Sequence, residues 1–143
     1  MTRIDFHSNV PDKISYACRL VRKARAHSAD ARIVVFAGDR MQLMAADQAL
    51  WTFSESDFLP HVLAGDPLAA QTPVVLTDSD TADLQHHQIL INLSQATPRN
   101  FARFERMFEI ISSDETDTVA GRQRYGFYKQ RGYPLTHFVA EQA

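Results

Sequence analysis

The chain is poor in the residues from which many small active sites are built. Its 143 residues include 1 cysteine, 5 glycines, 6 prolines and 1 tryptophan. A single cysteine excludes an internal disulfide and a cysteine-rich zinc site, and it fits a reducing compartment. There is no run of about 18 apolar residues and no apolar export segment at the N-terminus, so we expect a soluble cytoplasmic protein without a membrane span.

Strong charge of one sign is also lacking. The chain has 15 Lys and Arg against 17 Asp and Glu, a net charge of -2. This balance argues against wholesale binding to a polyanion, although it leaves room for a local basic patch. Apolar residues make up 45% and charged residues 22%, as in ordinary globular proteins. The length, with no repeat or linker, predicts a single domain over residues 1–143.

Short apolar runs alternate with amphipathic segments along the chain. The segments predicted to form strands are Arg3–Ser8, Arg32–Gly38, Thr72–Asp78, His87–Leu93 and Met107–Ser112. Helices are predicted from Asp12 to about His27, from Asp39 to about Trp51, and over a last segment that stops before Gly132, with a short helix or turn after Pro98. Strands that alternate with helices predict an α/β fold, a three-layer αβα sandwich around a mostly parallel sheet.

Capping pairs mark two of the predicted helix starts. Gln42 stands three residues after Asp39, and Glu115 stands three residues after Ser112, as in capping boxes. We expect Arg124 to be one of the cations that crowd the end of the last helix, where they complement the helix dipole.

No combination of residues indicates a reaction. Gly38 follows a predicted strand, but a dinucleotide-binding fingerprint needs three glycines and a P-loop needs a Lys-Ser/Thr pair. His86 and His87 are neighbours on a predicted strand, so they point to opposite faces and cannot share a metal ion. Cys18 lies on the apolar stripe of the first helix, where packing is favoured over nucleophilic chemistry. The sequence therefore predicts no catalytic residue, metal or cofactor, and favours a binding module.

Three stretches of the chain, taken together, carry a family resemblance. They are RIDFHS at 3–8, DQALWTFSESDFLPHVLAG at 47–65 and AGRQRYGFYKQRGYPL at 120–135. In order and spacing they resemble the chi subunit of the bacterial DNA polymerase III holoenzyme, a clamp-loader accessory protein. The resemblance covers nearly the full chain. It implies a nucleotide-binding-like topology without a phosphate loop and a protein without an activity of its own.

The resemblance implies that one surface binds the small psi subunit of the clamp loader. It assigns to this surface Trp51, Phe58, Leu59, Pro60 and His61. Aromatic side chains on a rigid turn suit this role, because they give a large contact area at a small entropic cost. The alternative is that Trp51 and Phe53 are core residues that close the second helix against the sheet.

The resemblance also implies a second surface, for the acidic C-terminal tail of single-stranded DNA-binding protein. Arg122, Tyr125, Gly126 and Lys129 fall on one stripe of the last predicted helix. Arginine pairs with carboxylates through two hydrogen bonds, and a tyrosine ring offers an apolar wall. The alternative is a solvated basic helix end. Gly126 and Thr118 stand where some family members carry lysine, which predicts a less basic site.

The predicted function is a non-catalytic replication subunit that bridges psi to single-stranded DNA-binding protein and reaches DNA only indirectly. A repair helicase is a further candidate partner. Two other functions stay open. A crevice near Gly38 and Asp39 would suit a small nucleotide-dependent enzyme. Arg99, Arg103 and Arg106, together with the last predicted helix, would suit a direct nucleic-acid-binding protein. The missing phosphate loop and the net acidic charge count against these two alternatives.

Overall fold

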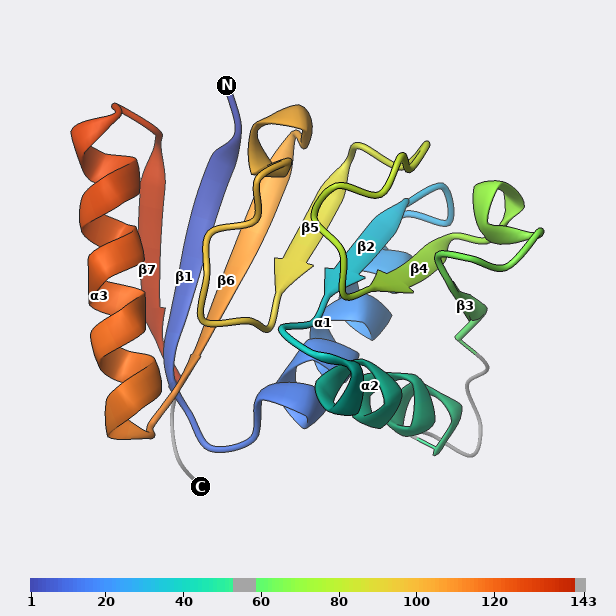
Figure 1. Cartoon of the computed structure of the whole chain (residues 1–143), viewed down its shortest axis with the longest axis horizontal. Helices are drawn as coiled ribbons and strands as arrows, with labels where there is room; N and C mark the ends of the chain where they lie inside the picture. The colour runs from blue at the N-terminus through green and yellow to red at the C-terminus, as the bar shows by residue number, and fades with distance from the viewer. Residues whose placement is uncertain (53–58, 141–143) are drawn as a thin grey trace.

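Seven strands form the centre of the structure, a computed structural model that describes residues 1–52 and 59–140. They are β1 (Arg3–Val10), β2 (Ile33–Phe36), β3 (His61–Leu63), β4 (Val74–Thr77), β5 (Ile89–Asn92), β6 (Arg106–Ser112) and β7 (Leu135–Val139). They form one sheet in the order β3-β4-β2-β5-β6-β1-β7, which runs from right to left in Figure 1. Every strand pairing among the described residues is parallel. The predicted α/β class is confirmed.

Helices and short turns cover both faces of the sheet. The helices are α1 (Lys13–His27), α2 (Arg40–Thr52) and α3 (Glu115–Gln130), and the two 3-10 turns are η1 (Ala69–Gln71) and η2 (Phe101–Arg103). Cys18 of α1 and Leu43 of α2 belong to the cluster on one face. Phe101 of η2 and Tyr128 of α3 belong to the cluster on the other face. Helices on both faces make this the predicted three-layer arrangement.

The predicted Asp39 cap of α2 is confirmed, α1 is capped by the residue at which its start was predicted, and the predicted cap of α3 is wrong. Asp12 accepts hydrogen bonds from two backbone N–H groups at the start of α1, and Asp39 accepts one from the Gln42 N–H at 2.8 Å. At α3 the N-cap is Asp114, whose carboxylate accepts the Asp117 N–H at 3.2 Å. The predicted pairing of Ser112 with Glu115 is therefore wrong, because β6 continues through Ser112.

The two edge strands, β3 and β7, were not among the predicted strands. β3 has only three residues, and four of the five residues of β7 are exposed. Neither segment therefore shows the buried apolar run that identifies a central strand. Gly132, with φ of 82°, ends α3 in the left-handed conformation and lets the chain turn into β7 beside β1.

A buried polar network attaches α3 to the sheet. Arg124 does not lie in the last turn of α3 and is only 4% exposed, so the prediction that it complements the dipole at the helix end is wrong. Its Nε donates to Glu109 at 3.0 Å, and the Tyr128 hydroxyl donates to the same oxygen at 2.6 Å. Asn92 donates to the other Glu109 oxygen at 2.9 Å. Complete burial raises the pKa of Glu109, although the Arg124 charge and the three donors act in the opposite direction.

A glycine brings α3 close to the sheet on the same face. A Cβ added at Gly121 would lie 2.5 Å from Cγ1 of Ile111 on β6, closer than two carbon atoms can approach. The absence of a side chain at this position thus sets the distance between α3 and β6. It also positions the next stripe of α3, which carries Arg122 and Tyr125.

Candidate protein-binding sites

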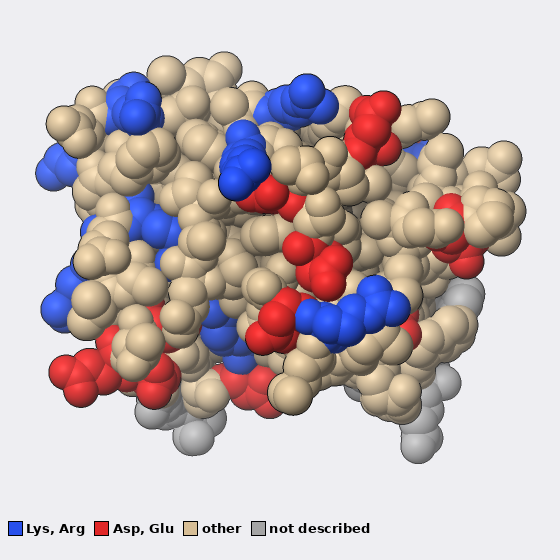
Figure 2. Space-filling view, viewed as in Figure 1, with Lys and Arg blue, Asp and Glu red and all other residues tan. Residues whose placement is uncertain are grey.

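A groove of about 480 Å³ lies between α3 and the β1–β7 side of the sheet. The four residues predicted to bind the acidic tail all line it: Arg122, Tyr125, Gly126 and Lys129. Phe6 of β1 and Ile111 of β6 contribute apolar walls. Figure 2 shows Lys and Arg side chains along the outer side of α3, with acidic side chains gathered at its beginning. The groove therefore combines an apolar lining with positive charge at its rim.

The side chains of the groove are placed by packing rather than by ion pairs. The Tyr125 ring stands edge-on to the Phe6 ring, with centroids 5.0 Å apart. Arg122 and Lys129 are exposed, and within the described part of the chain neither forms an ion pair. A Cβ at Gly126 would meet nothing within 4 Å. No acidic side chain of the described residues therefore occupies either cation, which leaves both open to carboxylates of a partner as far as these residues go.

Two polar residues of the groove were not predicted from the sequence. His137 of β7 and Ser8 of β1 both line it, and the Ser8 hydroxyl lies 2.6 Å from Nε2 of His137. His137 was missed because β7 was missed, and without β7 nothing indicated that Ser8 of the predicted first strand faces this groove. The available indication was the run Leu-Thr-His-Phe-Val after Pro134, which is rich in residues that favour strands.

At the opposite end of the sheet, the end of α2 meets β3. Trp51 is 54% exposed, and its ring lies 4.7 Å from the His61 ring, centroid to centroid. Nδ1 of His61 donates to the Leu59 carbonyl at 2.5 Å. Nε2 of His61 lies 3.4 Å from a carboxylate oxygen of Asp47 on α2. The buried imidazole thus links β3 to α2 and supports the Trp51 ring.

The residues predicted to bind psi divide into two groups. Trp51 presents an exposed indole, which is not the core position that the alternative interpretation gave it. Leu59 and His61 are buried and pack inward, while Pro60 is half-buried. Phe58, and Phe53 of the core alternative, lie outside the described residues. Among the described members of this set, Trp51 therefore offers the largest accessible apolar side chain.

Sequence comparison gives the family. The sequence profile described as DNA polymerase III chi subunit, HolC, matches residues 1–136. The chain belongs to this family. The chi subunit of Pseudomonas aeruginosa is 31% identical over 139 residues, which cover 94% of each chain. The chi subunits of Haemophilus influenzae and Escherichia coli are each 25% identical, over 105 and 104 residues, covering 73% of this chain and 73% and 71% of theirs. The predicted family resemblance is confirmed.

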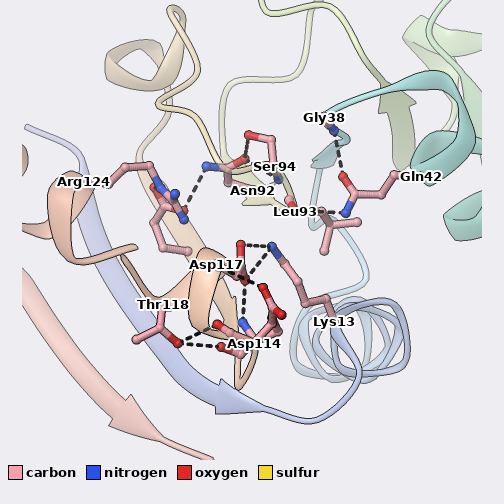
Figure 3. A network of polar contacts seen from close by, with 12 residues as sticks. Lys13, Gly38, Gln42, Asn92, Leu93, Ser94, Asp114, Asp117, Thr118 and Arg124 are labelled. Carbon is pink, nitrogen blue, oxygen red and sulfur yellow. Dashed lines mark hydrogen bonds and ion pairs between the residues drawn. The ribbon is translucent and has the colours of Figure 1, made fainter. Parts of the chain in front are cut away.

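This chi-family protein also has a cleft of about 650 Å³ at the carboxyl ends of β2, β5 and β6. Gly38 and Asp39 line this cleft, so it is the crevice that a small nucleotide-dependent enzyme would use (Figure 3). The Gly38 N–H donates to the Gln42 side-chain oxygen at 2.7 Å, and the Gln42 amide nitrogen donates to the Leu93 carbonyl at 3.1 Å. Lys13 and Asp117 form an ion pair at 3.1 Å. These polar groups are thus paired with one another, and no group of three metal-binding side chains occurs among the described residues.

The Lys13–Asp117 pair joins α1 to the beginning of α3. Burial would raise the pKa of Asp117, but the Ser112 N–H, at 2.6 Å, and the Lys13 charge outweigh it, so that the pKa is lowered. Burial lowers the pKa of Lys13, although Asp117 opposes this effect. The pair thus fixes one end of the helix that carries the groove.

The direct nucleic-acid-binding alternative relied in part on Arg106. Its guanidinium donates two hydrogen bonds to one carboxylate oxygen of Asp5, at 2.8 and 2.5 Å. That neutralisation leaves Arg106 poorly placed to hold a phosphate. None of the helices within the described residues is both long and apolar enough to cross a membrane.

Proposed function

We propose that this chain is a non-catalytic accessory subunit of a DNA polymerase III holoenzyme. In this role it bridges the psi subunit of the clamp loader to the acidic C-terminal tail of single-stranded DNA-binding protein. Its relatives are named as DNA polymerase III chi subunits. The observation that carries the proposal is the groove in which Arg122, Tyr125 and Lys129 come together beside an apolar lining.

The groove suits a short peptide that ends in carboxylates and an apolar side chain. Arg122 is the bidentate partner for a carboxylate, and Tyr125 forms the apolar wall. Lys129 acts at the rim. A contact of this size is weak, about micromolar or roughly -8 kcal/mol. Because both cations are exposed, the affinity falls as salt rises.

The test of the groove is a titration of a labelled tail peptide at two salt concentrations. Arg122→Ala should remove most of the binding. Arg131→Ala is the matched control, because Arg131 stands at the end of the same helix, with its guanidinium 4.4 Å from the Phe127 ring centroid, and does not line the groove. Equal affinities for the two variants would mean that the basic stripe is only a solvated helix end.

The bridging role requires that both partners bind at once. The groove lies on the β7 side of the sheet, and Trp51 lies on the β3 side, with five strands between these two edges (Figure 1). We expect the protein, psi and the tail peptide to form a ternary complex in sedimentation velocity. Displacement of the peptide by psi would contradict the bridge while leaving each binary contact possible.

A further inference from the structure

Within the described residues, the outer edge of β7 is a free strand edge. β7 pairs with β1, and among the described residues no strand lies on its other side. The Pro134 carbonyl accepts a hydrogen bond from β1 at 3.0 Å, and the Ala140 N–H donates one to β1 at 2.9 Å. Even-numbered residues of this segment therefore turn their backbone groups toward β1. Since alternate residues address opposite sides of a strand, the outward backbone groups belong to Leu135, His137 and Val139.

This edge lacks the features that usually prevent another strand from pairing. Proteins protect free edges with lysine, proline, bulges or very short strands. β7 reads Leu-Thr-His-Phe-Val, and its register with β1 runs without a bulge over all five residues. Phe138 is 48% exposed and Val139 is 63% exposed. The edge is therefore regular, accessible and composed of residues that favour strands.

The two sides of β7 differ in chemistry, which limits what would pair with it. On one side His137 lines the groove that also holds Arg122 and Lys129. On the other side the Phe138 ring stacks on the His7 ring, with centroids 5.1 Å apart. An added strand would point alternate side chains toward the cations and toward the aromatic pair. An extended peptide with acidic and apolar side chains fits this pattern.

We propose that β7 is a docking edge on which the acidic peptide continues as an eighth strand. The terminal residues of the peptide occupy the groove, and the residues before them pair with the backbone of His137 and Val139. This inference rests on the tail binding proposed above. It adds main-chain hydrogen bonds, which are independent of side-chain charge, to the contact made by Arg122.

The first test is amide hydrogen exchange by NMR, with a long tail peptide and a short one that contains only the terminal residues. We expect the long peptide to slow exchange at His137 and Val139 by about tenfold or more. The amides of Thr136 and Phe138 should change little, because they already face β1. If both peptides bind but exchange at His137 and Val139 is unchanged, the strand proposal fails and the groove proposal stands. If neither peptide binds, the groove proposal fails and the strand proposal fails with it.

The second test is a substitution at the edge itself. Val139→Pro removes an outward N–H and no hydrogen bond to β1, a position where an edge strand tolerates proline. Val139→Ala is the control, because it shortens the side chain and keeps the N–H. We expect Val139→Pro to weaken the long peptide about fivefold, the effect of one lost hydrogen bond, and to leave the short peptide unaffected. Equal binding of the long peptide to both variants would overturn the proposal.

A second copy of the chain is the competing occupant of the edge. Sedimentation of the protein alone, over a range of concentrations, tests it. We expect no association that Val139→Pro removes. A dimer that Val139→Pro abolishes and Val139→Ala preserves would assign the edge to self-association and overturn the proposal for the peptide.

Discussion

The two edges of the sheet differ in what they offer to a partner. At the β3 edge, the accessible feature is the Trp51 indole, which rests on a buried histidine. At the β7 edge, the accessible features are two cations, a tyrosine wall and a strand edge. An exposed aromatic side chain that a partner covers gives a contact that is insensitive to salt, whereas exposed charges give one that salt weakens. The difference favours a lasting subunit contact at β3 and an exchangeable contact at β7.

The edges also differ in how they are attached to the rest of the molecule. The β7 side depends on α3, which is held by the Glu109 network and by the close approach of Gly121 to β6. The β3 side depends on the His61 imidazole between β3 and α2. Changes in one set of contacts should therefore affect one partner more than the other, which makes the comparison testable.

The largest effect is expected from Glu109→Ala. The change leaves Arg124, Tyr128 and Asn92 without their buried acceptor, and breaking such a pair costs about 3–5 kcal/mol. Urea unfolding measures this loss. Glu109→Gln is the control, because it keeps an acceptor oxygen and should cost less. Among molecules that remain folded, tail binding should fall more than psi binding. Equal losses of both would show that the two edges are not independent.

The second prediction concerns the β3 edge. Trp51→Ala should weaken psi binding by about 2 kcal/mol, as for an aromatic hot spot, and change the free energy of unfolding little, because the residue is 54% exposed. Met41→Ala is the control, an exposed apolar residue near the other end of α2. Calorimetry with psi measures both. An unchanged affinity of Trp51→Ala for psi would show that Trp51 is not an aromatic anchor for this partner.

The way in which each segment packs also explains which strands and helices could be predicted from the sequence. The central strands and the helices α1 and α2 were predictable from the sequence, because those segments pack apolar side chains against the core. α3 was predicted from its stop before Gly132 and the cations near its end, but its buried stripe is Asp117, Gly121, Arg124 and Tyr128, which contains no aliphatic residue. Hydrophobic spacing therefore does not reveal Arg124 as an interior residue.

The candidate sites were predictable to different degrees for a related reason. The residues predicted to bind the tail were placed by their spacing along one helix, and Arg122, Tyr125 and Lys129 do line one groove in the structure. The residues predicted to bind psi span a turn and an edge strand, where spacing along the chain does not determine which side chains face outward. Leu59 and His61 therefore proved to be buried.

A third prediction compares two glycines of α3. By helix propensity alone, alanine should stabilise either position by about 1 kcal/mol. At Gly121 the new Cβ would collide with Ile111, and overpacking of this kind costs about 1–3 kcal/mol, so we expect a net loss of about 1 kcal/mol in Gly121→Ala. Gly126→Ala, which meets open space, should be stabilising. Thermal unfolding measures both. Stabilisation by Gly121→Ala would mean that α3 can move away from β6.

The smallest effect on stability is expected from the protonation of Asp117 at low pH. Because the pKa of Asp117 is lowered in the folded protein, its stabilising contribution is present above the ordinary carboxyl pKa of about 3.9 and is lost as pH falls through the folded pKa. Urea unfolding from pH 6 downward should show this loss in the wild type and not in Asp117→Asn. Burial raises the pKa of Glu109, which gives the opposite slope in both proteins. The difference between the two curves therefore isolates Asp117.

Lys13→Met separates the two groups that lower the pKa of Asp117, because it removes the Lys13 charge and keeps the Ser112 N–H. It should reduce the acid-dependent loss without abolishing it. Because Asp117 lies in the first turn of α3, protonation should release the start of the groove helix and leave the β3 edge unchanged. Relative to Asp117→Asn, in which Asp117 no longer titrates while the carboxylates of the tail still do, the wild type should show an additional loss of tail binding in acid and no such loss of psi binding. An equal additional loss of tail binding and psi binding in acid would show that the Lys13–Asp117 pair stabilises both edges of the sheet rather than the β7 side alone.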